Sequence, residues 1–364
     1  MTYGIPLMET EINNLNDLAS QLKVSELDIN RIKANSMNEY NFVLGLSTDK
    51  PCPFLTKEKL CSIHLNWGKK LKPKICQLFP FSFTYTPNGY YLYPSFASTA
   101  VIFNMGQALT QQDFTDKLNL FLEIYPNLNL DWNNIYLLDG EKIDFKKYLK
   151  HEEHILNVLD SNNFSFKDKL FGCLDYFCSL NVNQLKIKDL DNIDPKQIDG
   201  HIVSSFYNFI FKQTTDIDLN STSFMMELLN VSKSDNLNIS LDNNLYTKFR
   251  QLSKDDREVL ENILSRFFYA RIFAKLYFGP GFNNLSLIAG FNHLILIVLL
   301  TAIESTLFLH NNPEIALHYD TMAKVIRHVE RRFTLLKYSP KTLTILEVLL
   351  TCQDRMTRLV DTIL

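Results

Sequence analysis

The sequence lacks the glycine-rich and nucleophile motifs that mark several large enzyme classes. It contains no G-x-G-x-x-G, no phosphate-binding P-loop and no G-x-S-x-G string. The first two motifs place backbone N–H groups against phosphates, and the third holds a serine nucleophile on a sharp turn. Dinucleotide-binding, nucleotide-hydrolysing and serine-hydrolase functions are therefore without motif support.

The chain also lacks a surplus of charge of either sign. It carries 37 basic and 40 acidic side chains in 364 residues, which gives a net charge of -3 at pH 7. No long run of one sign interrupts the pattern, whereas a nucleic-acid-binding protein shows a basic stripe. We therefore expect no nucleic-acid partner. A hydrophobic content of 46% is enough for a packed core, and the length suits two domains or one large domain with an appendage.

Cysteine is too sparse for a disulfide scaffold, with six residues in the whole chain. The first residues, MTYGIPLMETEI, have neither the basic nor the apolar segment of a signal peptide. Both observations predict a reducing, cytoplasmic compartment. Clustered thiols in that compartment are more often metal ligands or catalytic groups than disulfides.

One apolar segment, residues 285–303, has the length of a membrane span and carries no formal charge. Asn292 and His293 lie at its middle, where unpaired polar groups are costly in lipid. Glu304 follows directly, and no basic cluster flanks the segment to set an orientation. We predict the central buried helix of a soluble domain and no membrane span.

The predicted fold is mainly α, with a helical bundle-like domain at residues 111–364 and a small cysteine-bearing α+β module at 1–110. Asn88-Gly89 predicts the turn of a β-hairpin in the small module, because tight hairpin turns need positive φ angles. Short links between long helices predict an antiparallel bundle in the larger domain. Helices are expected at 9–23, 25–32, 113–124, 145–159, 166–180, 201–212, 224–231, 253–278, 283–309, 313–336 and 340–364, and strands at 40–46, 79–86, 90–96, 135–138 and 142–143.

The stretch 51–81, PCPFLTKEKLCSIHLNWGKKLKPKICQLFPF, holds three of the six cysteines. Cys52, Cys61 and Cys76 each stand beside a proline or an apolar anchor, which limits the entropy lost when a metal orders the loops. Their spacing, C-x8-C-x14-C, is neither that of a zinc finger nor that of a ferredoxin. On spacing alone, it is equally plausible that these cysteines are small apolar side chains packed in a core.

Histidines and the remaining cysteines leave further alternatives. His64 is spaced to join Cys61 on one metal, or it is an exposed loop histidine. Cys173 and Cys178 share a predicted apolar helix, and Cys352 lies in another, so we expect all three to pack in cores. The string HEEH at 151–154 lacks the HExxH spacing and predicts a solvated helix face.

Four arginines, Arg266, Arg271, Arg331 and Arg332, lie on helices that are rich in aromatic residues. They could line a pocket for an anionic ligand. The simpler interpretation, which we favour, is that they cap and solvate their helices. His293, inside the apolar helix, predicts a hydrogen-bonded core histidine.

The string CPFL-x5-C-x-I-H, a charged spacer and then P-x2-C-x2-FP resembles a bacterial family of zinc- or iron-chelating cysteine-cluster proteins, whose best-defined branch is the flagellin lysine N-methylases. The segments GYYLYPSFASTAVIFNMGQAL, IYLLDGEKIDFKKYLKHEEHILNVL and RFFYARIFAKLYFGPGFNNLSLIAG are similar to later parts of that family. The resemblance implies that Cys52, Cys61 and Cys76 are cluster ligands. It also implies a protein-lysine N-methyltransferase that uses S-adenosylmethionine and a metal or iron–sulfur centre and acts on a protein substrate.

The sequence departs from the family pattern at three places. The family opens with a CxxxCxxCC-type cluster, and this chain has no cysteine before Cys52. Gln77 stands where the family has arginine, and Ser98 stands where members place another cysteine. Three thiolates suffice for zinc with His64 or water as the fourth ligand, or for a four-iron cluster with one open iron. The departures favour an alternative: a non-catalytic protein-interaction module with a degenerate cluster, stabilised by zinc or metal-free.

Overall fold

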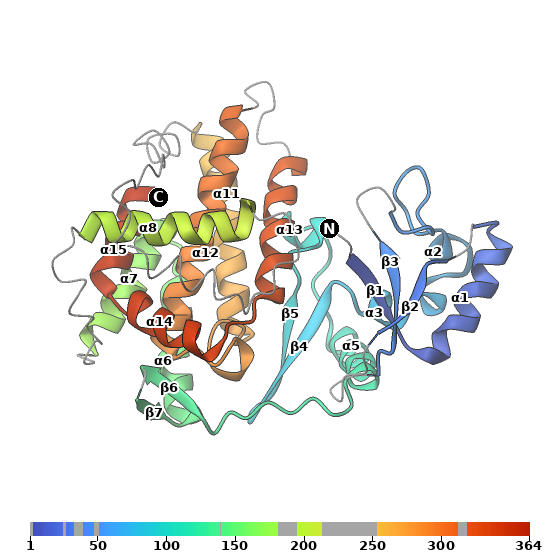
Figure 1. Ribbon diagram of the computed structural model, residues 1–364, viewed down its shortest axis with the longest axis horizontal. Coiled ribbons are helices and arrows are strands. Elements are labelled where there is room, and N and C mark those ends of the chain that lie inside the picture. The colour runs from blue at the N-terminus through green and yellow to red at the C-terminus, as the bar shows by residue number, and fades with distance from the viewer. Residues whose placement is uncertain are drawn as a thin grey trace. The chain divides into compact units, whose positions relative to one another are not determined.

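The computed structural model describes residues 3–24, 27–32, 39–46, 51–138, 140–180, 195–212, 253–311 and 319–364 (Figure 1). The chain forms two compact units. The first comprises Met1–Tyr85 with Gly106–Asn129, and the second comprises Thr86–Met105 with Leu130–Leu364. The chain therefore passes between the units more than once, whereas the sequence suggested a single division at residue 110.

The first unit contains a three-stranded antiparallel sheet in the order β1-β3-β2, formed by β1 (Tyr3–Leu7), β3 (Phe42–Leu46) and β2 (Ile29–Arg31). Helix α1 (Glu9–Gln21) confirms the helix predicted at 9–23 and buries Leu15, Leu18 and Ala19 against this sheet. The Glu11 carboxylate accepts from the Met8 N–H at 2.8 Å and so closes the first turn.

Residues 25–32, predicted as a helical piece, contain the edge strand β2 instead. Ile29 pairs with Leu44 and Arg31 with Phe42 on the central strand. Local helix propensity differs among residues by less than about 1 kcal/mol, so pairing with a neighbouring strand overrides it. The helix prediction was wrong for the described residues 27–32, while residues 25 and 26 lie outside the description.

The cysteine-bearing stretch folds into short elements: α2 (Ser62–Trp67), a 3-10 turn (Lys69–Leu71) and α3 (Lys74–Leu78). Helix α5 (Gln111–Ile124) belongs to the same unit, where Glu123 forms a 2.8 Å ion pair with Lys74. Strands β4 (Phe81–Thr86) and β5 (Gly89–Pro94) form the predicted hairpin, and Gly89 has φ +110°. The Thr86 hydroxyl donates to the Gly89 carbonyl at 2.9 Å.

The second unit begins with β5 and the short helix α4 (Thr99–Ile102) and continues with a second hairpin, β6 (Ile135–Leu138) and β7 (Glu141–Ile143). Helices α6 (Phe145–Asp160) and α7 (Phe166–Ser179) follow, as predicted, and Asp144 caps α6 by accepting the Lys147 N–H at 2.6 Å. Helix α8 (Pro195–Tyr207) then runs into a π-helical turn (Asn208–Lys212). The helix predicted at 224–231 and Asp139 of the second turn lie outside the described residues.

Helix α12 (Leu287–Asn311) is the centre of the second unit (Figure 1). Around it lie α11 (Lys254–Phe273), α13 (Tyr319–Leu335), α14 (Pro340–Leu350) and α15 (Gln353–Ile363). Among the described helices, α12 is the one long and apolar enough to cross a membrane. Of its most apolar stretch, 94% is buried inside the unit. The prediction of a central buried helix is thus confirmed.

The C-terminal helix predicted at 340–364 is in fact two helices. Ser339 caps α14 as expected by accepting the Thr342 N–H at 3.2 Å, but the helix stops at Leu350 and α15 begins after the extended Cys352. The Arg355 guanidinium donates to the Leu349 carbonyl and so satisfies an acceptor that the break leaves without a helical donor. The predicted start at Asn312-Pro313 lies outside the described residues.

Candidate functional site: a cluster of three thiols

Each cysteine in residues 51–81 is positioned by a short local element. The Cys52 carbonyl accepts the Leu55 N–H at 3.0 Å in a turn, Cys61 caps the start of α2, and Cys76 lies within α3. Leu55 and Cys61 form an isolated antiparallel bridge. The segment thus folds back on itself and carries Cys52 and Cys61 on the two arms of one loop.

The apolar neighbours of the cysteines anchor this loop in the small core of the first unit. Phe54 and Ile63 are buried, and Cys52 and Cys61 pack against the same core while remaining half-buried. The Ser62 N–H and hydroxyl both donate to the Phe54 carbonyl, at 2.7 and 2.8 Å. Buried apolar neighbours and backbone hydrogen bonds therefore hold the loop that carries Cys52 and Cys61.

The other two thiols lie close enough to Cys76 to raise its pKa. Burial raises the pKa of the Cys76 thiol to about 12, the Lys72 ammonium opposes this, and Cys52 and Cys61 add to it. Burial also raises the pKa of Cys52, while a hydrogen bond from the Phe54 backbone N–H lowers it. Cys61 acts on Cys52 as a further raising influence, and Lys72 as a further lowering one. The Lys72 charge therefore acts on two of the three thiols, Cys52 and Cys76.

This arrangement fits a thiophilic metal in the types of its donors. Thiols are the preferred ligands of such ions, and hydrogen bonds and positive charge around the sulfur atoms stabilise thiolates. The positions of the thiols are a different matter. Within the described ranges, no three His, Cys, Asp or Glu side chains lie where they could together hold a metal ion. His64, on α2 one turn after Cys61, has an exposed side chain.

Gln77 stands at the position where the resemblance predicts arginine. Its side-chain amide donates to the carbonyls of Lys70 at 3.1 Å and Lys72 at 2.6 Å, and its own backbone carbonyl accepts from the Lys117 ammonium at 2.6 Å. The residue therefore holds the lysine-bearing turn beside Cys76. This role gives Gln77 a structural function that the sequence pattern did not indicate.

The other predicted positions are not part of the cluster. Ser98 belongs to the second unit, where it precedes α4. Cys173 is buried in α7 and its pKa is raised to about 12 by burial, which confirms core packing. The same prediction was wrong for Cys178, which is exposed on the last turn of α7, and for Cys352, which is half-buried at the break before α15.

A buried ion pair in the second unit was missed at the level of sequence. Lys275 and Glu152 lie 2.8 Å apart with side chains 0% and 7% exposed, and the ammonium lies 3.2 Å from the centre of the Tyr91 ring. Burial lowers the pKa of Lys275 and raises that of Glu152. The prediction of a solvated HEEH face was wrong for His151 and Glu152. The signal was present, because Glu152 follows Tyr148 by one helical turn and so shares its core-facing side.

The arginines do not gather around an anionic pocket. Arg266, on α11, donates to the Val101 and Ile102 carbonyls at the end of α4, at 2.9 and 2.5 Å, so it caps a neighbouring helix and not its own as predicted. Arg271 is buried and paired with the Glu330 carboxylate, which also accepts the Tyr93 hydroxyl at 2.9 Å. For Arg271, then, the expectation of a solvated side chain was wrong.

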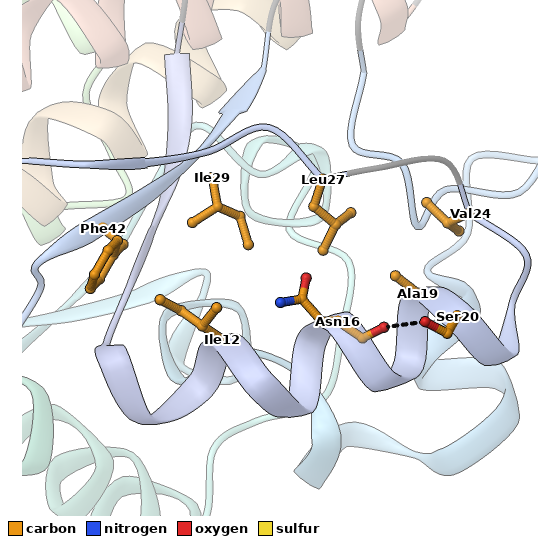
Figure 2. A pocket seen from close by; sticks show the side chains of 8 residues that line it. All are labelled: Ile12, Asn16, Ala19, Ser20, Val24, Leu27, Ile29 and Phe42. Atoms are coloured by element: carbon orange, nitrogen blue, oxygen red, sulfur yellow. Dashed lines mark hydrogen bonds between the residues drawn. The ribbon is translucent and has the colours of Figure 1, made fainter.

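A groove of about 560 Å³ runs along α1 in the first unit (Figure 2). Its walls come from α1, from the segment that follows α1 and from β2 and β3, and they combine apolar side chains with polar groups. Figure 2 shows the Asn16 side chain pointing from α1 into the space below Leu27 and Ile29. The lining residues are Ile12, Asn16, Ala19, Ser20, Val24, Leu27, Ile29 and Phe42.

Comparisons with known proteins leave the family open. No protein-family model, curated protein or solved structure matches this chain. The resemblance of residues 51–81 to the cysteine-cluster family therefore stays a prediction that rests on the sequence strings alone.

Proposed function

We propose that Cys52, Cys61 and Cys76 bind a thiophilic metal centre, either zinc or an iron–sulfur cluster. The observation that carries the proposal is that Cys52 and Cys61 both act on Cys76, while the Lys72 ammonium acts on Cys52 and Cys76. Lys72 lowers the pKa of both Cys52 and Cys76, and the Phe54 N–H does the same for Cys52. His64, exposed one turn after Cys61, is the candidate fourth ligand.

We further propose, on the sequence resemblance alone, that the chain is a protein-lysine N-methyltransferase that uses S-adenosylmethionine. A bound metal would supply a charge that keeps the three thiols deprotonated and orders their loops. A substrate lysine must lose its proton before it attacks a methyl group, which requires a base or a desolvating pocket. The thiol cluster supplies no identified base, so this part of the proposal depends on direct measurement.

The test starts from protein purified without oxygen. Zinc, iron and acid-labile sulfide are measured for the wild type and for the variants Cys52→Ser, Cys76→Ser and Cys178→Ser. We expect metal in the wild type, its loss with Cys52→Ser or Cys76→Ser, and no change with Cys178→Ser, whose thiol is exposed on α7. Metal that survives Cys76→Ser would contradict the site.

The methyltransferase proposal has its own measurement. Calorimetric titration with S-adenosylmethionine is expected to show saturable binding, followed by methyl transfer to a lysine-bearing protein. A metal-loaded chain that binds no S-adenosylmethionine would contradict the enzyme and leave the metal site standing. The two parts of the proposal can therefore fail separately.

The groove along α1 favours a second candidate, a non-catalytic module that binds a protein partner. The occupant that fits is an extended peptide, because a carboxamide such as that of Asn16 offers one donor and one acceptor to a peptide backbone. The apolar members of the lining, such as Ile12 and Phe42, would contact the peptide's side chains. Zinc content without S-adenosylmethionine binding is the result that would favour this candidate.

A further inference from the structure

Exposed apolar side chains gather in the cysteine-bearing stretch of the first unit. Single exposed leucines are normal on a protein surface, so what matters is how they are concentrated. Among the described residues, twelve large hydrophobic side chains are exposed, and five of them lie within residues 51–81. Their exposed fractions run from 37% to 58%, and they are Leu55, Leu60, Leu65, Leu71 and Phe79. The stretch therefore presents apolar side chains to solvent as well as to the core.

Three of these leucines belong to the start of α2 and to the loop before it. Cys61 caps the helix, so Leu60 stands directly before the cap and Leu65 is the fourth helical residue. Apolar side chains at these two positions commonly pack against each other at a helix start. Leu60 is 52% and Leu65 is 58% exposed, so more than half of each remains in solvent. Leu55 lies beside them, because it forms the antiparallel bridge with Cys61.

The loop before α2 holds two lysines next to these leucines. The Thr56 N–H donates to the Leu60 carbonyl at 2.8 Å, and the Lys59 N–H donates to the Thr56 carbonyl at 2.9 Å. The tip of the loop is therefore a closed turn, and Lys57 and Lys59 are exposed on it. Because the turn is already formed, little conformational entropy is lost when it contacts a partner.

The charge of the same stretch is almost entirely positive. Residues 51–81 contain six lysines and one acidic residue, Glu58, although the whole chain has a net charge of -3. Lys74 is paired with Glu123 at 2.8 Å, and Lys72 is half-buried. The exposed lysines are Lys57, Lys59, Lys69 and Lys70. They stand before and after α2, whose length is about 9 Å, and lysines spread in this way suit a broad anionic surface better than one small anion.

We propose that the loop 55–60 and the start of α2 bind the surface of a membrane that contains anionic phospholipids. Leu60 and Leu65 enter the boundary between headgroups and acyl chains, and the lysines contact the headgroups. A protein partner is a poorer match, because lysine is depleted at protein interfaces. Nucleic acid is poorer as well, because its backbone offers charge and no apolar layer for the leucines. The contact is peripheral, and it requires neither a metal nor S-adenosylmethionine.

The test is co-sedimentation of the full chain with vesicles of phosphatidylcholine alone and of phosphatidylcholine mixed with phosphatidylserine. Wild-type protein is compared with Leu60→Gln, Leu65→Gln and the double variant Lys57→Gln/Lys59→Gln. All four side chains are exposed, so the variants should fold, which circular dichroism checks. The control Val259→Gln removes an apolar side chain that is 42% exposed on α11 of the second unit.

We expect binding to the vesicles that contain phosphatidylserine, little binding to phosphatidylcholine alone, and weakening by added salt. Each leucine variant should lower the partition coefficient about fivefold, since about half of the transfer of a leucine side chain is lost. The double lysine variant should lower it about twentyfold, as two charges near the surface are removed. Val259→Gln and the charge control Lys146→Gln, an exposed lysine on α6, should bind like the wild type.

Absence of vesicle binding by the wild type would overturn the proposal. Equal binding to both kinds of vesicle would also overturn it, since the lysines would then have no part. Weakening by the lysine variant with wild-type binding in both leucine variants would show attraction by surface charge without insertion, which contradicts the site. An oligonucleotide that binds to protein that no vesicle binds would assign the lysines to nucleic acid instead. Equal losses in Val259→Gln and Leu65→Gln would remove the assignment to this stretch.

Discussion

His293 shows how a single buried residue can affect the pH dependence of the protein's stability. Its ring lies inside the second unit and is bonded to the Tyr338 hydroxyl at 2.8 Å, among the rings of Phe206, Phe282 and Phe333. Burial lowers the pKa of His293 from 6.5 to about 3. The sequence predicted a hydrogen-bonded core histidine, and the structure confirms it. The partner, Tyr338, could not have been named, because it follows a different helix.

The pKa of His293 predicts that stability falls as the pH is lowered from 6.5 towards 3. The unfolded chain takes up a proton on this ring near pH 6.5 and the folded chain does not until about pH 3, so protons favour unfolding in that window. The slope contributed by one such group is up to about 1.4 kcal/mol per pH unit. Urea unfolding at pH 7, 6 and 5 measures it.

The variant His293→Gln should reduce this slope, whatever it costs in stability at pH 7. The variant His154→Gln, which removes a ring on the exposed face of α6, should keep the wild-type slope. Identical slopes in all three proteins would contradict the assignment to His293.

At the scale of single elements, local chemistry predicted the starts of helices and the turn of the hairpin. Asp144, Ser253 and Ser339 cap helices as their sequence positions indicate, because a side-chain oxygen beside an N–H three residues on is a short-range signal. The strand at 29–31 was missed because its pairing partner, β3, lies beyond the next loop. The break between α14 and α15 was missed for a similar reason, since Arg355 compensates it with a side-chain bond.

Replacing Gly89 or Gly200 by alanine is expected to change the stability of the fold in opposite directions. Gly89 has φ +110° in the hairpin turn, where an added Cβ meets no atom within 4 Å, so Gly89→Ala costs backbone strain alone, about 1–3 kcal/mol. Gly200 lies within α8 with no atom within 4 Å of an added Cβ, so Gly200→Ala should stabilise by about 0.5–1 kcal/mol. Urea midpoints of the two variants test both, and a stabilised Gly89→Ala would contradict the turn geometry.

At the scale of the whole molecule, the sequence indicated the fold class but not how the chain divides. A mainly α chain with a small cysteine-bearing α+β part was predicted and is present. The membership of α5 in the first unit was not foreseeable, because it depends on contacts such as Lys117 with Gln77 across many intervening residues.

The division into compact units predicts which part of the chain a bound metal protects against local opening. A ligand that binds the folded site stabilises it against those openings that break the site, by about 2.7 kcal/mol at one hundred times the dissociation constant. Amide hydrogen exchange of the full chain with added zinc should therefore slow in peptides covering 52–78. Exchange in α12, which holds none of the thiols, should be unchanged.

The same experiment with Cys76→Ser separates binding at the cluster from binding elsewhere. Protection at 52–78 should disappear in this variant and persist in Cys178→Ser, because Cys178 lies on α7 of the second unit. Zinc that slowed exchange equally in 52–78 and in α12 would show that metal binding is coupled to the opening of the whole chain. Zinc that left 52–78 unprotected would mean that the three thiols do not close around an ion. In that case their common environment would be explained by packing against Phe54 and Ile63 alone.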